Sequence, residues 1–243
     1  MIGADEPAGG HGDVLPGPRD VDLDRVWLGV AARVWHRHPG PVERLAARLL
    51  RSPGLARALV TTPSLLLGWV IATAAVLLTG VGFTLGTGMP WVALLAPAVA
   101  AAGIAYAYGP GIDPAWELSQ SMAVSDRMVL LVRALAVFGM NAALGVVASA
   151  ASGAAPAVTL GWLVPMTAVC ALALAAATVT RSANVGVAAG SAGWVIAILA
   201  GQAAEGRYTA AVTDSALVLP YLAFAACCGA VVLFATRTTR GTR

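Results

Sequence analysis

Side chains able to do acid–base, nucleophilic or metal chemistry are scarce in this sequence. Its 243 residues include 15 arginines, no lysine, 3 histidines and 3 cysteines. A P-loop ATP site ends in Gly-Lys-Ser/Thr, so the absence of lysine excludes one. Cys170, Cys227 and Cys228 lie inside apolar runs, where no disulfide framework or zinc spacing is available to them. His11, His36 and His38 lie in the polar N-terminal part, so we expect no metal, cofactor or catalytic site.

The apolar segments are also free of the groups that membrane chemistry uses. No Asp, Glu, His or Lys stands in the middle of any of them. Proton relays, intramembrane metal sites and ion-coupled carriers usually need such residues within a span, and an intramembrane serine protease needs a His or Lys base. The sequence therefore disfavours a proton-driven pump and an intramembrane hydrolase.

The polar connection at 109–127 contains residues that a simple linker does not require. Asp113 is a good N-cap and Pro114 suits the first helical position, so a short helix is predicted to start here. Glu117 would place a negative charge near the positive end of that helix. Trp116 on an exposed surface favours a contact with another protein. The alternative is an interfacial turn that places Trp116 among lipid headgroups.

The elements that would hold these residues are membrane helices. The chain is 58% hydrophobic and 11% charged, with a mean hydropathy of +0.79, whereas soluble domains carry about 25% charged residues. Six apolar stretches are each long enough to cross about 30 Å of hydrocarbon as a helix. We therefore predict an all-α polytopic membrane protein with six transmembrane helices, at roughly 63–83, 90–108, 128–148, 160–179, 185–202 and 216–235. The short gap 180–184 predicts a tight antiparallel hairpin.

The remaining parts of the chain are assigned by their patterns. Residues 1–20 are predicted to be disordered, residues 21–60 to form cytoplasmic or in-plane amphipathic helices, 61–236 to be the transmembrane domain and 237–243 a basic tail. The second amphipathic helix, over 42–60, is basic and adjoins the first span, which favours the headgroup plane over a soluble partner. The first presents one apolar face at helical spacing, formed by Leu23, Val26, Trp27, Val30, Ala31 and Val34.

Arginine placement predicts the orientation. Fourteen arginines fall on one side of the predicted topology, and only Arg207 falls on the other. The positive-inside rule makes the arginine-rich side cytoplasmic. Both termini and the connection that follows the second span are therefore predicted to lie in the cytoplasm.

Two features inside the spans are candidates for a pathway or a helix interface. Asn141 in the third span suits an interhelical hydrogen bond, with a substrate contact as the alternative. The fifth span carries a stripe of small residues, which allows close approach of another helix. That approach would occur either within this chain or at a subunit interface or moving gate. The stripe consists of Gly186, Gly190, Gly193, Ala197 and Gly201.

The polar connection also resembles a known family. The run from Asp113 to Leu118, followed by Ser125 and by Arg133 in the third span, is similar to the Asp-Pro-x-x-Glu-Leu stretch of bacterial ABC-transporter permease subunits of the type-2 exporter class. The resemblance implies a coupling helix over 113–125 that contacts a separate ABC ATPase. The residues it implies for coupling are Asp113, Pro114, Trp116, Glu117, Ser121, Ser125 and Arg127.

The same resemblance implies partners and a location. It implies a non-enzymatic transport subunit in the bacterial plasma membrane, paired with a second copy or a related permease, in contact with lipid and not with nucleic acid. Two alternatives remain. One is a non-transporting anchor or sensor whose N-terminal helices bind a cytoplasmic regulator, and the other is a facilitator that works without ATP.

Overall fold

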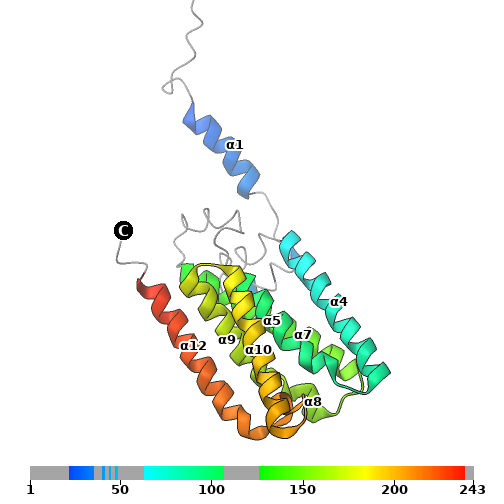
Figure 1. Ribbon diagram of the computed structural model, residues 1–243. Helices are drawn as coiled ribbons and strands as arrows, with labels where there is room; N and C mark the ends of the chain where they lie inside the picture. The colour runs from blue at the N-terminus through cyan, green and yellow to red at the C-terminus, as the bar shows by residue number, and fades with distance from the viewer. Residues whose placement is uncertain are drawn as a thin grey trace, which may run out of the picture. The chain divides into compact units, whose positions relative to one another are not determined.

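The computed structural model describes residues 22–35, 40, 41, 44, 47, 48, 63–106 and 126–238. Every regular element in this part of the chain is a helix, which confirms the all-α prediction. The helices (Figure 1) are α1 (Leu23–Trp35), α4 (Pro63–Thr87), α5 (Trp91–Tyr106), α7 (Asp126–Ala151), α8 (Pro156–Gly161), α9 (Leu163–Thr180), α10 (Ala183–Glu205), α11 (Ala210–Thr213), the 3₁₀ helix η1 (Ser215–Leu217) and α12 (Val218–Thr238).

The chain divides into two units, Met1–Pro41 and Val42–Arg243. The first contains α1, whose start is capped because Asp22 Oδ1 accepts a hydrogen bond from the Arg25 amide at 3.1 Å. The predicted disordered segment 1–20 and nearly all of the predicted helix 42–60 lie outside the described residues. α12 ends at Thr238, so the first two residues of the predicted basic tail, Arg237 and Thr238, are helical.

The second unit is a helix bundle with five helices long and apolar enough to cross a membrane. They correspond to five of the six predicted spans, and this composition marks a multi-pass membrane protein. The predicted span at 90–108 corresponds to α5, which is apolar but has only 16 described residues. At 1.5 Å per residue these 16 residues rise about 24 Å, less than the hydrocarbon thickness of about 30 Å.

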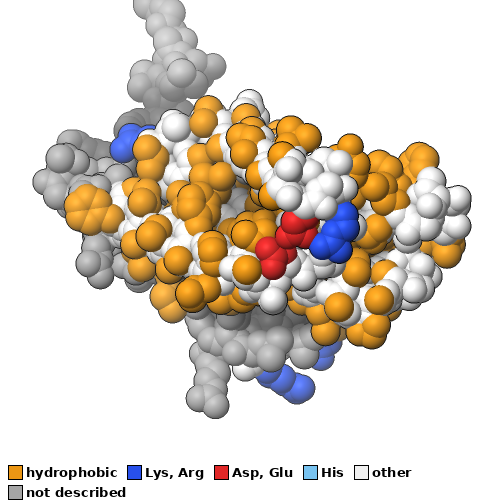
Figure 2. Space-filling model, turned by 60° about the horizontal axis from the view of Figure 1, so that its bottom comes forward, with side chains coloured by type: hydrophobic (Ala, Val, Ile, Leu, Met, Phe, Trp, Pro, Cys, Tyr) orange, Lys and Arg blue, Asp and Glu red, His pale blue; other side chains and the backbone are white. Residues whose placement is uncertain are grey.

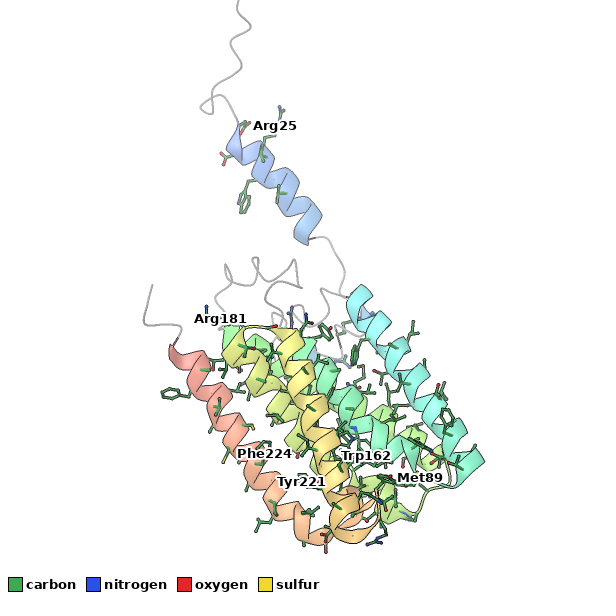
Figure 3. The ribbon with its side chains drawn as sticks, viewed as in Figure 1. Arg25, Met89, Trp162, Arg181, Tyr221 and Phe224 are labelled. Atoms are coloured by element: carbon green, nitrogen blue, oxygen red, sulfur yellow. The ribbon has the colours of Figure 1, made fainter. Side chains whose placement is uncertain are left out.

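The long helices alternate in direction. The start of α4, the α9–α10 turn with Arg181 and the end of α12 lie at one end of the bundle, while Met89 and α8 lie at the other (Figures 1 and 3). The predicted α9–α10 hairpin is confirmed, because only Arg181 and Ser182 separate the two helices. Arg181 adopts a left-handed conformation with φ 54°, and the Ser182 amide donates to the Ala177 carbonyl at 3.2 Å, which closes the end of α9.

The core lies around α5 and α9. α5 packs against α4, α7, α9 and α10, and α9 packs against α5, α10 and α12. Alanines at full burial dominate the contact surfaces, with Ala100, Ala101 and Ala105 on α5 and Ala173 and Ala177 on α9. Small side chains allow close helix approach, which matters in lipid because the solvent is as apolar as the helices themselves.

The sequence did not predict two short helices at the Met89 end. The predicted span 160–179 is interrupted at Trp162, which separates α8 from α9. The connection between α10 and α12 contains α11, whose Ala210, Ala211 and Val212 are all buried. α11 contacts α8, α9 and α10, so this connection is part of the packed bundle and is no simple loop.

Candidate functional site

The predicted coupling segment falls outside the part of the chain that the structure describes. Six of its seven predicted coupling residues lie in the interval between Tyr106 and Asp126, namely Asp113, Pro114, Trp116, Glu117, Ser121 and Ser125. Arg127 belongs to the first turn of α7, but its side chain is outside the described set. The structure does describe the two helices on either side of this segment, α5 and α7, and these pack against each other.

The small-residue stripe packs within the chain at its first two positions. A Cβ atom at Gly186 would lie 2.7 Å from the carbonyl oxygen of Ala173 on α9 and 3.0 Å from the Cβ of Ala105 on α5. At Gly190 it would lie 2.9 Å from the Cβ atoms of Ala101 and Ala173. These separations are shorter than carbon–carbon contact, so the two glycines let α10 approach α5 and α9 together.

The other stripe residues have different neighbours. A Cβ atom at Gly193 would meet only the tip of the Leu172 side chain, at 2.7 Å, among the described atoms. Ala197 packs against the buried core as a partly exposed residue. At Gly201 a Cβ atom would lie 3.0 Å from the backbone nitrogen of Ala211, so this glycine accommodates α11. The stripe is therefore three successive interfaces along one helix.

A buried tryptophan joins α10 to α5. The sequence did not predict this contact. Trp194 is 1% exposed, and its Nε1 donates a hydrogen bond to the Leu94 carbonyl oxygen on α5 at 2.6 Å. Pro97, a buried residue inside α5, has no N–H to donate to the preceding turn, which weakens the helix there. An indole in an apolar segment that also contains glycines was the available signal, because a buried Trp N–H usually finds a partner.

Two other tryptophans fit against glycines. A Cβ atom at Gly103 would lie 2.6 Å from the Trp69 ring, and one at Gly145 would lie 2.5 Å from the Trp162 ring. Trp69 thereby joins α4 to α5, and Trp162 joins the α8–α9 junction to α7. Figure 3 shows Trp162 within the bundle. Each indole ring packs directly on the glycine backbone, and this close packing fixes the positions of the two helices relative to each other.

Asn141 lies on α7 at 3% exposure. Its Nδ2 donates to the Val137 carbonyl at 2.7 Å in the same helix. Its Oδ1 accepts a long hydrogen bond, 3.5 Å, from the Thr73 hydroxyl on α4. The amide therefore has partners on both α7 and α4, which is the arrangement of an interhelical hydrogen bond.

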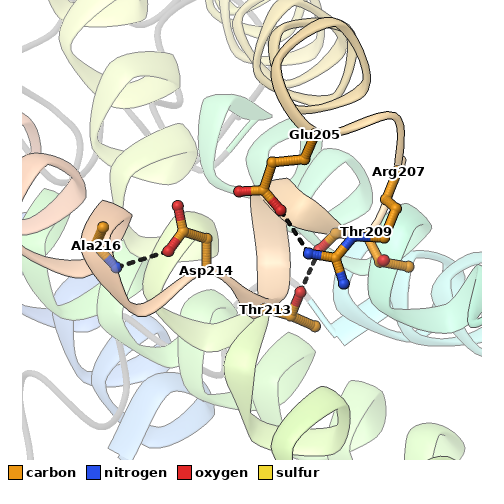
Figure 4. Close-up of polar contacts among 6 residues, drawn as sticks. All are labelled: Glu205, Arg207, Thr209, Thr213, Asp214 and Ala216. Atoms are coloured by element: carbon orange, nitrogen blue, oxygen red, sulfur yellow. Dashed lines mark hydrogen bonds and ion pairs between the residues drawn. The ribbon is translucent and has the colours of Figure 1, made fainter.

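Charged groups gather at the α11 end of the bundle (Figure 4). Arg207 Nη2 lies 2.6 Å from Glu205 Oε2, and Asp214 Oδ1 accepts from the Ala216 amide at 2.9 Å. Figure 2 shows acidic and basic side chains together on this end, among hydrophobic ones. The Arg207 side chain is 64% exposed, so this ion pair contributes little to stability. Asp214 caps η1, which fixes where the chain turns into α12.

Buried polar atoms without a partner among the described residues are few. They are Trp69 Nε1, Ser149 Oγ, Trp162 Nε1 and Gln202 Oε1. The described residues contain no group of three or more His, Cys, Asp or Glu that could hold a metal ion. Within the described residues, the bundle interior therefore consists of close helix packing and isolated hydrogen-bonding groups.

Comparisons with protein-family models, with curated proteins and with solved structures found no match for this chain.

Proposed function

We propose that this chain is the transmembrane permease subunit of an ATP-driven exporter of the ABC class. In this proposal α5 and the residues that follow it form the sixth span, both termini are cytoplasmic, and two permease chains enclose the substrate pathway. The observation that carries the proposal is the Asp113-to-Leu118 sequence, which stands between two membrane helices and resembles the coupling stretch of such permeases.

The packing of α5 supports a coupling role for the segment that follows it. α5 contacts α4, α7, α9 and α10, more of the long helices than α4 or α12 does. A displacement at the Tyr106 end of α5 would therefore act directly on the four helices that contact it. Close-packed interiors transmit such shifts because they have little free volume in which to absorb them.

The placement of charges supports the proposed orientation. Arg181 and the end of α12, with Arg237, lie at one end of the bundle (Figure 3). Arg207 lies beyond the opposite end of α10. The arginine-rich end would face the cytoplasm, which is also the side on which an ATPase would find residues 113–125.

The energy source in this proposal is a partner chain. ATP binding and hydrolysis would occur on a separate ATPase, since this sequence contains no lysine for a P-loop. That ATPase shifts the permease between inward-open and outward-open states only if it contacts the two states differently. Trp116 and Glu117 are the residues we assign to that contact.

A double substitution tests the assignment. We expect Trp116→Ala with Glu117→Ala to leave membrane insertion intact and to weaken ATPase association by roughly thirtyfold or more, as loss of an interface hot spot does. The matched control is Ser119→Ala with Gln120→Ala in the same segment. Co-purification of an ABC ATPase with the full-length chain from native membranes is the measurement. Equal ATPase recovery with both double variants would overturn the coupling role.

The second candidate function is a membrane anchor whose N-terminal part binds a cytoplasmic regulator. It is favoured by α1, which belongs to a separate unit and exposes Val26, Trp27 and Val30. Deletion of residues 1–41 separates the two functions. A permease keeps its ATPase without this segment, whereas an anchor loses whatever protein it recruits.

A further inference from the structure

We propose that α1 is a membrane-surface helix that lays the face containing Val26, Trp27 and Val30 on anionic lipid of the bilayer that holds the bundle. This inference requires only that the bundle is embedded in a membrane and is independent of the ATPase assignment. It also concerns a part of the chain outside the region that resembles permeases.

The first observation is the exposure of large apolar side chains on α1. Trp27 is 67% exposed and Val26 52% exposed, and Leu28 and Val30 are exposed as well. Trp27 and Val30 are three residues apart and so lie on one side of the helix, while Ala32 lies about 120° or more around the helix from Val26, Trp27 and Val30. A short helix with tryptophan on an exposed apolar face suits the boundary between headgroups and acyl chains.

The second observation is charge complementarity with an anionic surface. Residues 22–62, which include all of α1 and lead to the first membrane helix, contain seven arginines against three acidic residues, Asp22, Asp24 and Glu43. The segment therefore has four more positive than negative side chains, and two of the acidic ones lie at the start of α1. A basic residue near an anionic bilayer multiplies affinity by about fivefold. Basic juxtamembrane segments of this kind are attracted to acidic phospholipids, and a neutral bilayer would lack that attraction.

The third observation is the tether. α1 ends at Trp35 and α4 begins at Pro63. The residues between them span at most about 100 Å even when fully extended. A bilayer surface is therefore always within reach of α1, at high effective concentration. A soluble partner would have to compete with that surface for the same apolar face.

Fluorescence quenching in nanodiscs tests the proposal on the full-length chain. Cys170, Cys227 and Cys228 are replaced by Ala, and a bimane label is placed on Val30→Cys or, as the opposite-face control, on Ala32→Cys. Nanodiscs contain either phosphatidylcholine alone or phosphatidylcholine with phosphatidylglycerol. Quenchers are a headgroup-proximal lipid nitroxide and aqueous iodide.

We expect the label at position 30 to be quenched by the lipid nitroxide in the anionic discs and several-fold less in the neutral ones. The label at position 32 should be quenched by iodide. Arg33→Glu with Arg37→Glu should reduce the lipid quenching at position 30 several-fold, because it reverses two charges beside α1. The control pair Arg240→Glu with Arg243→Glu, at the far end of the chain, should leave that quenching unchanged.

Two results would overturn the proposal. Equal quenching of both labels by iodide in both lipids would place α1 free in water. Protection of position 30 from iodide and from the lipid nitroxide would show that protein covers this face. Neither result depends on whether an ATPase binds residues 113–125, so failure here is distinguishable from failure of the exporter assignment.

Discussion

α9 and α12 are neighbours of similar length, yet they occupy opposite environments. The candidate span that contains α12 (Ser215–Thr236) has the higher mean hydropathy, 2.3 against 2.0 for the one that contains α9 (Pro156–Thr180), but it is the least buried of the five. Among the described side chains of α12, Cys228 and Val232 alone belong to the core, whereas α9 contributes Met166, Ala173 and many others. In a bilayer, hydropathy therefore decides insertion, while side-chain size and shape decide which helices become interior.

α10 and α4 bury an equal share of their candidate spans, yet their glycines have different surroundings. Each carries several glycines, but a Cβ atom at Gly186 or Gly190 of α10 would collide with α9, whereas one at Gly82 of α4 would meet no described atom within 4 Å. A glycine in a membrane helix is thus informative only when its neighbours are known. The comparison between interior and peripheral helices leads to four predictions, given in order of expected effect.

The largest effect should come from a glycine at the α10 interface. We expect Gly186→Leu to destabilise the bundle by more than about 3 kcal/mol, because the new side chain meets the carbonyl oxygen of Ala173, which cannot move without α9. Gly82→Leu on α4 is the matched control and should change stability by less than about 0.5 kcal/mol. The midpoint of SDS-driven unfolding in mixed micelles measures both.

Gly193→Leu should give an intermediate effect in the same unfolding experiment. Its closest described neighbour is the flexible tip of Leu172, which can rotate away, so its effect should fall between those of the other two. If Gly186→Leu unfolds no more easily than Gly82→Leu, then the stripe does not hold α10 against α5 and α9.

The next effect isolates one hydrogen bond. Trp194→Phe and Trp162→Phe each shrink a side chain that is at most 1% exposed, but only the Trp194 indole has a described acceptor, the Leu94 carbonyl. We expect Trp194→Phe to be more destabilising by about 1 kcal/mol, the net value of such a bond. Equal unfolding midpoints would mean that the Trp194–Leu94 hydrogen bond adds nothing beyond packing.

The sequence predicted the helical class, the α9–α10 hairpin and the position of five long apolar helices. These follow from composition and segment length, which act locally along the chain. It did not predict the break at Trp162, the buried α11 or the Trp194 hydrogen bond to α5. Each of these depends on a contact between residues far apart in the sequence, and no periodicity within one helix encodes such a contact.

The small-residue stripe is a single feature that the sequence predicted only in part. Its spacing predicted close helix approach, and Gly186 and Gly190 do receive neighbouring backbone and alanines. The spacing left open whether the neighbour belongs to this chain or to another one. Only the positions of Ala101, Ala105 and Ala173 decide that question.

A smaller effect should separate two buried polar residues of α7. Asn141→Leu removes the hydrogen bond from Thr73 and should cost about 0.6 kcal/mol, the average for interhelical hydrogen bonds measured in a membrane protein. Ser149→Ala removes a hydroxyl that has no described partner, so it should be neutral or slightly stabilising. The midpoint of thermal unfolding, with both variants in one detergent, measures the two effects. A lower midpoint for Ser149→Ala than for the unchanged chain would show that the Ser149 hydroxyl is bonded to water.

The smallest effect concerns two adjacent valines of α12. Val232 is 3% exposed and packs in the core, whereas its neighbour Val231 is 45% exposed. In lipid the surroundings of an exposed valine are as apolar as its side chain, so truncation there loses little. We expect Val232→Ala to cost about 0.5 kcal/mol through lost packing alone, and Val231→Ala to leave the unfolding midpoint unchanged.

Association of two chains, measured by single-molecule photobleaching in liposomes, is the second readout. If Val231→Ala weakens association while the unfolding midpoint stays fixed, the exposed face of α12 contacts the second permease chain. If both readouts are unchanged, this face meets only lipid, and the dimer contact required by the exporter proposal lies on another helix.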